Sequence, residues 1–285
     1  MTTEVITLPD GRRLCWHEFG DLGGSPVIYT AGTPVSGLGG AAYDQAARAA
    51  GLRWISPDKP GYGGSGYQRN RSLLSWADDV AVLAGHLGLD RFALAGESGG
   101  GPYTLAAALR LADRVSVVVL VASAGGVRSP AELAGVQARI RFYVWLARHA
   151  PALNAVPFMV MRWSLAIPAW RERSLRREMA AAPRAKHAGL RIEFEAVADA
   201  LRQGTRGAVQ ELALMRHPWP FRLSEVTTPV HLWHGTRDTN VPIATARRLA
   251  VELPEAILHV SDASAHDVGL DCSGEIMSVI VGHPR

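Results

Sequence analysis

The sequence predicts an α/β fold in which a mostly parallel sheet is interrupted by a helical insertion. Short apolar segments alternate with segments of helical periodicity up to residue 126 and again from residue 221. Residues 115–121 read Val-Ser-Val-Val-Val-Leu-Val, a β-branched run typical of a strand buried on both faces of a parallel sheet. Between these two regions, residues 127–220 show no clear strand pattern. Together these three observations favour helices on both faces of one sheet.

The remaining strands are expected at short apolar or alternating runs that lie beside turn residues. In chain order they cover residues 12–19, 26–30, 53–56, 91–95, 229–233 and 256–260. Helices are expected at residues 41–50, 72–87, 101–109, 244–253 and 274–281. Ser72 is a suitable N-cap for the second of these helices, whose apolar residues share one face.

The insertion is expected to be entirely helical, with its clearest periodicity at residues 140–147, 168–179 and 190–201. Ala124-Gly125-Gly126 breaks the chain directly after the buried strand. Aromatic residues at helical spacing more often pack than line a pocket. We nevertheless expect a few of them to face a substrate cavity, with Phe142, Trp145, Trp163 and Trp170 as the candidates.

Charge is unevenly distributed along the chain. The whole sequence has 30 Lys and Arg against 26 Asp and Glu, a net charge of +4. Residues 128–220 hold 15 basic and 7 acidic residues (+8), which leaves 15 and 19 (−4) elsewhere. A basic segment over a site could attract an anionic substrate or an acidic carrier protein, but a solvated arginine-rich surface is the favoured explanation. The arginines do not interleave with aromatic residues, so we expect no nucleic-acid partner.

The composition also bears on location and cofactors. No apolar run approaches the ~20 residues that span a bilayer, and the first residues do not resemble a signal peptide. A cytoplasmic protein without a membrane partner, either a monomer or a homodimer, is therefore expected. Cys15 and Cys272 fit neither a disulfide framework nor a metal site, and no metal or organic cofactor is expected.

The most informative segment is Gly96-Glu97-Ser98-Gly99-Gly100, which has the pattern G-x-S-x-G. It follows the strand expected at 91–95 and precedes the helix expected at 101–109, which begins with a proline. A serine on a tight turn between a strand and a helix is typical of a nucleophile elbow. Ser98 is therefore the predicted nucleophile.

A serine nucleophile needs a base and a group that orients the base. In chains with this elbow, the acid and then the histidine follow the serine. Asp238 follows a glycine turn after the strand at 229–233, and His266 follows the strand at 256–260. Both are thus expected at the sheet edge that carries Ser98. His234 and His259 are the competing histidines, but they lie beside or within strands.

Acyl transfer also requires donors for the developing oxyanion. The backbone N–H groups of Gly99, after the nucleophile, and Thr33, in the loop after the strand at 26–30, are the predicted pair. Glu97 either contacts substrate or makes a structural bond to the insertion, and we favour the structural bond.

At this point the sequence closely resembles the α/β-hydrolase superfamily. It is most similar to bacterial serine hydrolases with the loop motifs H-G-T-P-G-S, D-R-P-G-Y-G-x-S, G-x-S-G-G-G and W-H-G-x-x-D-x-x-V-P. The matching segments here are AGTPVS at 31–36, DKPGYGGS at 58–65, GESGGG at 96–101 and WHGTRDTNVP at 233–242. The resemblance covers nearly the whole chain outside the insertion.

The resemblance implies an eight-stranded α/β-hydrolase sheet, a core at 1–126 and 221–285, and a helical cap, or lid, at 127–220. It implies a carboxylesterase-like enzyme that cleaves an ester, thioester or lactone of a small, largely apolar molecule through an acyl-enzyme on Ser98. Epoxide and haloalkane chemistry is disfavoured, since those relatives carry an aspartate at the elbow. Ala31 and Val35 depart from the histidine and glycine usual in the family, and residues 262–266 depart from its G-x-G-H turn.

Several alternatives stay open for the same residues. The triad could serve C–C bond hydrolysis, a lyase, a cyclase or a cofactor-free peroxidase, since fold does not fix function. A ligand-binding receptor with low turnover is a second alternative. A prolyl-type aminopeptidase would require an acidic pocket for the ammonium group of its substrate. The basic insertion disfavours this activity.

Overall fold

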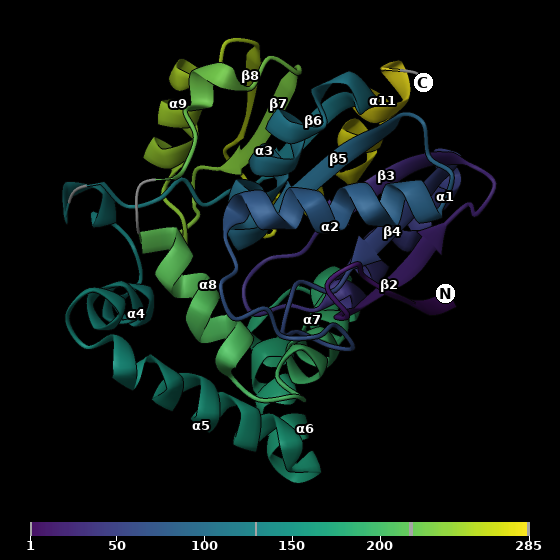
Figure 1. Cartoon of the computed structure of the whole chain (residues 1–285). Coiled ribbons are helices and arrows are strands. Elements are labelled where there is room, and N and C mark those ends of the chain that lie inside the picture. Colours follow the sequence, from purple (N-terminus) through teal and green to yellow (C-terminus); the bar gives the residue numbers. More distant parts are fainter. Residues whose placement is uncertain (1, 129, 217–218, 284–285) are drawn as a thin grey trace.

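The computed structural model describes residues 2–128, 130–216 and 219–283, and its centre is a sheet of eight strands (Figure 1). Their spatial order is β1-β2-β4-β3-β5-β6-β7-β8. The strands are β1 (Thr2–Thr7), β2 (Arg13–Gly20), β3 (Ser25–Thr30), β4 (Leu52–Pro57), β5 (Phe92–Glu97), β6 (Val115–Val121), β7 (Val230–Gly235) and β8 (Ala256–Ser261). β2 pairs antiparallel with β1 and with β4, whereas the other neighbours are parallel. The predicted fold is confirmed.

The edge strand β1 is the one strand of the described sheet that sequence patterning did not identify. Its residues Thr-Thr-Glu-Val-Ile-Thr are nearly all exposed, and it pairs with β2 alone. Polar residues at an exposed edge give little hydrophobic alternation, so the strand has a weak sequence signal.

The sheet separates two apolar cores. Along β6, Val118 and Leu120 point into one core, and Val117 and Val119 point into the other. The helices α2 (Leu73–His86), α3 (Gly101–Arg110) and α9 (Ile243–Glu252) cover the first core. The helices α1 (Asp44–Ala49), α10 (Val268–Asp271) and α11 (Ser273–Gly282) cover the second. β6 is thus buried on both faces, as its β-branched composition predicts.

The cap of α2 agrees with the sequence prediction. The Ser72 hydroxyl accepts a hydrogen bond from the Ser75 amide at 3.0 Å, and the Ser75 hydroxyl accepts one from the Ser72 amide. Two amides that the helix leaves unpaired at its start are satisfied in this way.

The chain between β6 and β7 carries α4 (Ala138–His149), α5 (Ala155–Ala166), α6 (Pro168–Ala181), α7 (His187–Ala200) and α8 (Arg206–Arg216). We call these five helices the helical insertion; they lie together on one side of the sheet (Figure 1). The sequence pattern indicated only three of them, at α4, α6 and α7. The domain boundaries at 127 and 220 stay a prediction.

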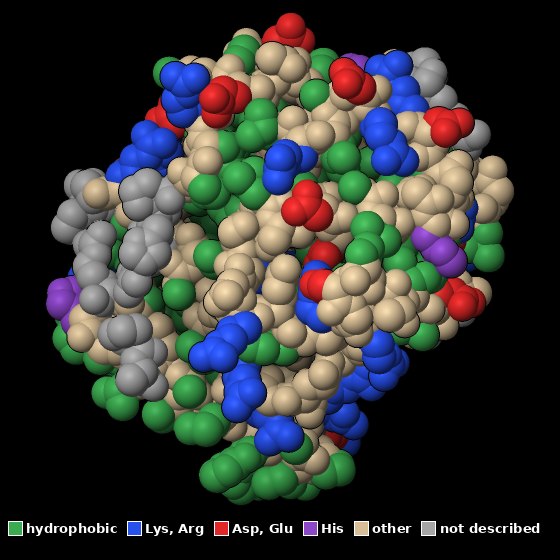
Figure 2. Space-filling view, in the orientation of Figure 1, with side chains coloured by type: hydrophobic (Ala, Val, Ile, Leu, Met, Phe, Trp, Pro, Cys, Tyr) green, Lys and Arg blue, Asp and Glu red, His purple; other side chains and the backbone are tan. Residues whose placement is uncertain are grey.

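The surface of the insertion carries many basic side chains, which Figure 2 shows on the lower half of the molecule. Within the part of the chain that the structure describes, no helix is both long enough and apolar enough to cross a membrane.

Candidate active site

Ser98 lies on a sharp turn between β5 and α3. Its φ of 49° is in the left-handed region, which costs a non-glycine residue about 1–3 kcal/mol and often marks a functional position. The neighbouring glycines allow close packing at this turn. A Cβ at Gly96 would come within 2.2 Å of the Thr104 hydroxyl, and one at Gly100 within 2.1 Å of the Thr30 carbonyl oxygen. The predicted strand–turn–helix arrangement is therefore present around Ser98.

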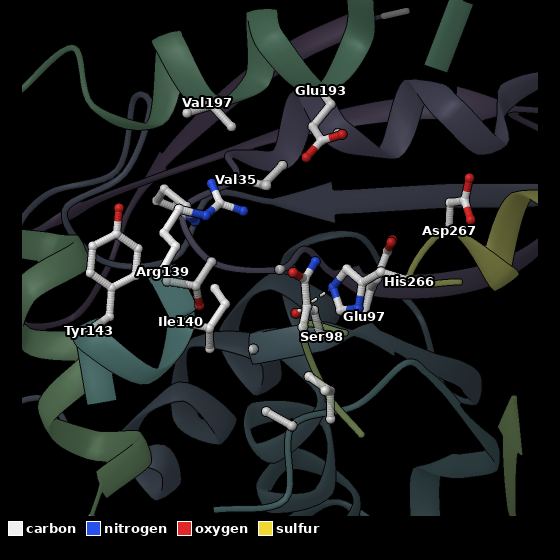
Figure 3. Close-up of a pocket in the computed structure, with 18 of the residues that line it drawn as sticks. Val35, Glu97, Ser98, Arg139, Ile140, Tyr143, Glu193, Val197, His266 and Asp267 are labelled. Carbon is white, nitrogen blue, oxygen red and sulfur yellow. Dashed lines mark hydrogen bonds between the residues drawn. The ribbon is translucent and has the colours of Figure 1, made fainter. Parts of the chain in front are cut away.

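The structure brings the three predicted triad residues together. His266 lies in the loop after β8, and its Nε2 is 3.1 Å from the Ser98 hydroxyl oxygen (Figure 3). Its Nδ1 is 2.7 Å from Oδ2 of Asp238, which lies in the loop after β7. The Asp238 side chain is fully buried, and its Oδ1 accepts the backbone N–H groups of Asn240 and Val241. Hydrogen bonds therefore connect the carboxylate, the imidazole and the hydroxyl.

The electrostatic surroundings of His266 suit a general base. Burial lowers the pKa of His266, but the hydrogen bond and charge of Asp238 outweigh it and raise the pKa above its ordinary value. Glu97 and Glu193 add to the increase. Burial raises the pKa of Asp238, but its bonds to His266 and the two amides keep the pKa below the usual value. Asp238 is thus anionic beside an imidazole whose protonated form it stabilises.

The competing histidines have other partners. His234 is buried, its Nε2 lies 2.8 Å from the Val241 carbonyl oxygen, and burial lowers its pKa. His259 stacks on Trp233 in the β7–β8 region, and its Nε2 lies 3.0 Å from His231 Nδ1. Neither histidine has a contact with Ser98.

The two predicted oxyanion donors lie beside Ser98. A Cβ at Gly99 would come within 2.1 Å of the Thr33 hydroxyl, so these two residues are immediate neighbours. A Cβ at Gly32 would lie 3.2 Å from Ser98 Cβ, which places the loop after β3 directly against the serine. Backbone amides in this position can stabilise charge that develops on a substrate oxygen.

A buried ion pair, which sequence reasoning missed, holds the loop that carries Thr33. Lys59 Nζ donates to the carbonyl oxygens of Ala31 and Gly32 at 2.9 and 3.0 Å, and to Glu211 Oε1 at 2.5 Å. The same Glu211 oxygen accepts the Thr33 hydroxyl at 2.6 Å. All three ammonium donors are thus used in a site that is almost completely closed to solvent.

Glu211 belongs to α8 of the helical insertion, so this pair joins the insertion to the loop that carries Thr33. Burial lowers the pKa of Lys59, while Glu211 opposes that effect. The sequence gives one hint of the pair, since Lys59 is one of only two lysines in the chain.

Glu97 makes its structural bonds to the core and not to the insertion, which corrects the expectation we favoured. Its Oε2 accepts the hydroxyl of Tyr29 at 2.5 Å and that of Tyr43 at 3.2 Å. Burial, together with the Glu97 charge, raises the pKa of both tyrosines well above the ordinary value. Glu97 also lines the cavity beside Ser98.

A cavity of about 800 Å³ opens over Ser98 and is enclosed largely by the helical insertion. Its apolar lining includes Val35, Ile140, Tyr143, Phe158, Leu165 and Val197. The four aromatic residues that we expected at the cavity do not line it. Phe142, Trp145, Trp163 and Trp170 are 50–64% exposed, because they lie on the outer faces of their helices. Their aromatic neighbours Tyr143 and Phe158 take the inner positions.

Charged side chains also reach the cavity. Arg139 extends from α4 and Glu193 from α7 toward the space above Ser98 (Figure 3). Glu193 is exposed to the cavity, but the protein that surrounds its carboxyl limits hydration, and this desolvation, followed by the charge of Glu97, raises the pKa of Glu193. The lining contains five acidic residues and two basic ones, namely Glu97, Glu132, Glu178, Glu193 and Asp267 against Arg139 and Lys186. Lys186 itself contacts Asp267, which follows His266. The basic character of the insertion therefore does not extend into the cavity.

Among the described residues, one group has the side chains and the proximity for a metal ion. The ligand atoms of Cys15, His17 and Asp58 lie within 4.8 Å of one another, and all three residues are buried. The Asp58 oxygens accept the amides of Gly37 and Gly64, each at 2.7 Å. Burial and the charge of Asp58 raise the pKa of Cys15 to about 12, so the thiol is neutral. We infer that this group is structural, because Asp58 anchors the chain segments that carry Gly37 and Gly64.

Curated proteins match only part of this chain. The dihydrolipoyllysine-residue acetyltransferase component of the acetoin cleaving system of Pseudomonas putida is 37% identical over 120 residues, which are 40% of this chain and 31% of that protein. Haloalkane dehalogenase 2 of Mycobacterium bovis is 39% identical over 75 residues, 24% of this chain and 25% of the dehalogenase. The chain thus matches less than a third of the length of either relative.

Solved structures match over almost the full length. An alpha/beta hydrolase fold protein from Nakamurella multipartita is 22% identical, with a TM-score of 0.69 and coverage of 99% of this chain and 98% of the other. An esterase from Exiguobacterium antarcticum is 19% identical, with a TM-score of 0.68 and coverage of 98% and 97%. At these identities the likeness shows the fold alone.

A family model described as the alpha/beta hydrolase family matches residues 13–277. The match includes Ser98, Asp238 and His266 and extends over nearly all of the sheet. The chain therefore belongs to the alpha/beta hydrolase family.

Proposed function

We propose that this protein is a serine hydrolase that cleaves a carboxylic ester, thioester or lactone through an acyl-enzyme on Ser98. The observation that carries the proposal is the hydrogen-bonded chain from Asp238 through His266 to Ser98, with distances of 2.7 and 3.1 Å. Family membership supports a hydrolase, and the elbow serine supports covalent catalysis.

In the first step His266 Nε2 takes the Ser98 proton as the hydroxyl oxygen attacks the substrate carbonyl carbon. Asp238 stabilises the resulting imidazolium, and the amides of Thr33 and Gly99 stabilise the oxyanion. The imidazolium then protonates the leaving group, and the acyl-enzyme forms. Water, deprotonated by His266, attacks the acyl carbon, and the returned proton restores the Ser98 hydroxyl.

The cavity lining supports one substrate class. Apolar side chains predominate around Ser98, which favours a small molecule with a largely apolar acyl group. Acidic residues outnumber basic ones in the lining, so we propose a neutral acyl group rather than the anionic or carrier-linked substrate that the sequence left open. We propose that no metal or organic cofactor takes part.

One observation favours a second candidate. Arg139 and Glu193 are charged groups that reach into the cavity, and neither belongs to the triad. Such groups could hold a dedicated substrate for C–C bond hydrolysis or a lyase reaction by the same triad.

The test is the hydrolysis of p-nitrophenyl esters from acetate to octanoate by the wild type and by Ser98→Ala in parallel. We expect turnover by the wild type and none above background for the variant. A fluorophosphonate probe should label the wild type alone. If the probe labelled Ser98 but the esters were not hydrolysed, a C–C hydrolase, a lyase or a ligand-binding receptor would be favoured instead. Equal turnover by both proteins would exclude Ser98 as the nucleophile.

A further inference from the structure

The helix α5 is apolar on the side that faces solvent. Val156, Val160 and Trp163 are 47, 62 and 64% exposed, and Met159 and Ile167 continue the same stripe. The spacing of three or four residues places these side chains on one side of the helix. The opposite side, with Phe158 and Leu165, is buried. A surface helix normally has a polar outer side, so the outer side of α5 requires an explanation.

Further exposed hydrophobic residues lie on α4, between α4 and α5, and at the start of α6, and together with the stripe we call them the apolar face. Its members are large hydrophobic residues that are 40–64% exposed: Phe142, Trp145, Leu153, Val156, Met159, Val160, Trp163, Ile167 and Trp170. Figure 2 shows hydrophobic side chains gathered along the lower edge of the molecule, where α5 and α6 lie. Exposed apolar patches of this kind mark interaction sites in soluble domains.

The apolar face is set within a strongly basic segment. Residues 138–181, from the start of α4 to the end of α6, contain eight arginines and two glutamates, a net charge of +6. Arg171, Arg173 and Arg177 are exposed on α6. Lys and Arg side chains lie next to the hydrophobic ones in Figure 2.

We propose that this apolar face docks on a lipid bilayer surface with anionic headgroups. Exposed tryptophans and aliphatic residues can enter the boundary between headgroups and acyl chains, while neighbouring arginines pair with the lipid charge. Each basic residue near an anionic surface contributes about 1 kcal/mol. A second copy of this chain is a poorer occupant, because the α4–α6 segments of two copies, each with a net charge of +6, would repel. This proposal replaces our expectation from the sequence that no membrane takes part.

Surface docking also gives the apolar cavity a source of substrate. The inner sides of α4 and α5 line the cavity through Ile140, Phe158 and Leu165, while their outer sides form the apolar face. One pair of helices would thus contact both the lipid surface and the substrate. The docking itself does not depend on the chemistry at Ser98.

The test is co-sedimentation of the full chain with vesicles of phosphatidylcholine alone and of phosphatidylcholine with 30% phosphatidylglycerol, at low and high salt. The apolar variant is Val160→Ser with Trp163→Ser, and the charge variant is Arg173→Gln with Arg177→Gln. The matched control is Leu22→Ser with Val251→Ser, since these two residues are also exposed but lie outside the apolar face. Thermal unfolding and analytical ultracentrifugation accompany every variant.

We expect the wild type and the control to sediment with the anionic vesicles, and high salt to release them. Both test variants should bind at least about tenfold more weakly while they unfold at the wild-type temperature. If the wild-type protein sedimented with neither type of vesicle, the proposal would be overturned. Unchanged binding of the apolar variant would also overturn it, because adsorption would then be electrostatic alone. A wild-type dimer that Val160→Ser with Trp163→Ser dissociates would show that a second copy covers the face.

Discussion

Asp238 reaches His266 with one carboxylate oxygen, at 2.7 Å from Nδ1, while two backbone amides hold its other oxygen. The two amides therefore hold the carboxylate in place independently of its hydrogen bond to the imidazole. This arrangement sets the tautomer of His266, so that Nε2 is free to accept the Ser98 proton.

The first prediction concerns Asp238→Asn. The amide is nearly the same size but carries no charge, and its N–H₂ group favours the wrong imidazole tautomer. We expect kcat to fall about 10⁴-fold, with a smaller change in KM. Ser98→Ala should abolish covalent labelling, and a double variant should be no worse than the poorer single variant, since the triad acts as a unit. Wild-type kcat in Asp238→Asn would rule out its orienting role.

The second prediction concerns the acid limb of the pH profile. Because His266 must be neutral to act as a base, kcat/KM should rise with pH, with its midpoint above 6.5, where an ordinary histidine titrates. Glu193 contributes to the raised pKa of His266 through its charge. Glu193→Gln should therefore move the acid limb to lower pH.

Glu195→Gln is the control for this measurement. Glu195 lies on the same helix, α7, but does not line the cavity, so its removal should leave the limb unchanged. An equal shift in both variants would mean that overall charge, not Glu193, determines the effect.

The three residues of the proposed triad could be predicted from the sequence because the position of each depends on local order. Ser98 lies in a short motif between a strand and a helix, and Asp238 and His266 each follow a strand of the same parallel sheet. Parallel strands end at one edge, so chain order alone places the three residues close together.

The cavity and the buried ion pair depend on information that chain order does not contain. Lys59 and Glu211 are 152 residues apart, and nothing in the local pattern of either residue indicates the other. On α4, Phe142 is exposed, whereas the adjacent Tyr143 lines the cavity. Successive residues of a helix point about 100° apart, so neighbouring side chains can lie on different sides. When both sides of a helix are apolar, the hydrophobic periodicity cannot show which side faces the cavity.

The third prediction distinguishes inner from outer residues of the insertion. Ile140 lines the cavity near Ser98 (Figure 3), so Ile140→Trp should shorten the longest acyl chain that is hydrolysed. We expect kcat/KM for the octanoate ester to fall about tenfold or more, with little change for acetate. Trp170→Ala, an outer residue, should keep the wild-type chain-length profile. The reverse pattern would contradict the placement of these side chains.

The fourth prediction concerns the Lys59–Glu211 pair, which we expect to position the Thr33 amide. Either single change to methionine would leave a buried charge without its partner, at a cost of about 3–5 kcal/mol in stability. The double variant Lys59→Met with Glu211→Met removes both charges and should fold, since apolar groups of similar volume can replace a buried pair.

In that double variant the carbonyls of Ala31 and Gly32 lose their ammonium donor, and the Thr33 hydroxyl loses its acceptor. The loop that carries Thr33 should therefore be less well held, and kcat should fall about 10- to 100-fold with KM nearly unchanged, less than the loss of an oxyanion donor. Faster hydrogen exchange at residues 31–33 would report the same loosening without any substrate. The control is Arg12→Met with Asp79→Met, a largely buried pair that does not line the cavity. If the Lys59–Glu211 variant is folded and retains wild-type kcat, the pair stabilises the protein without positioning the loop.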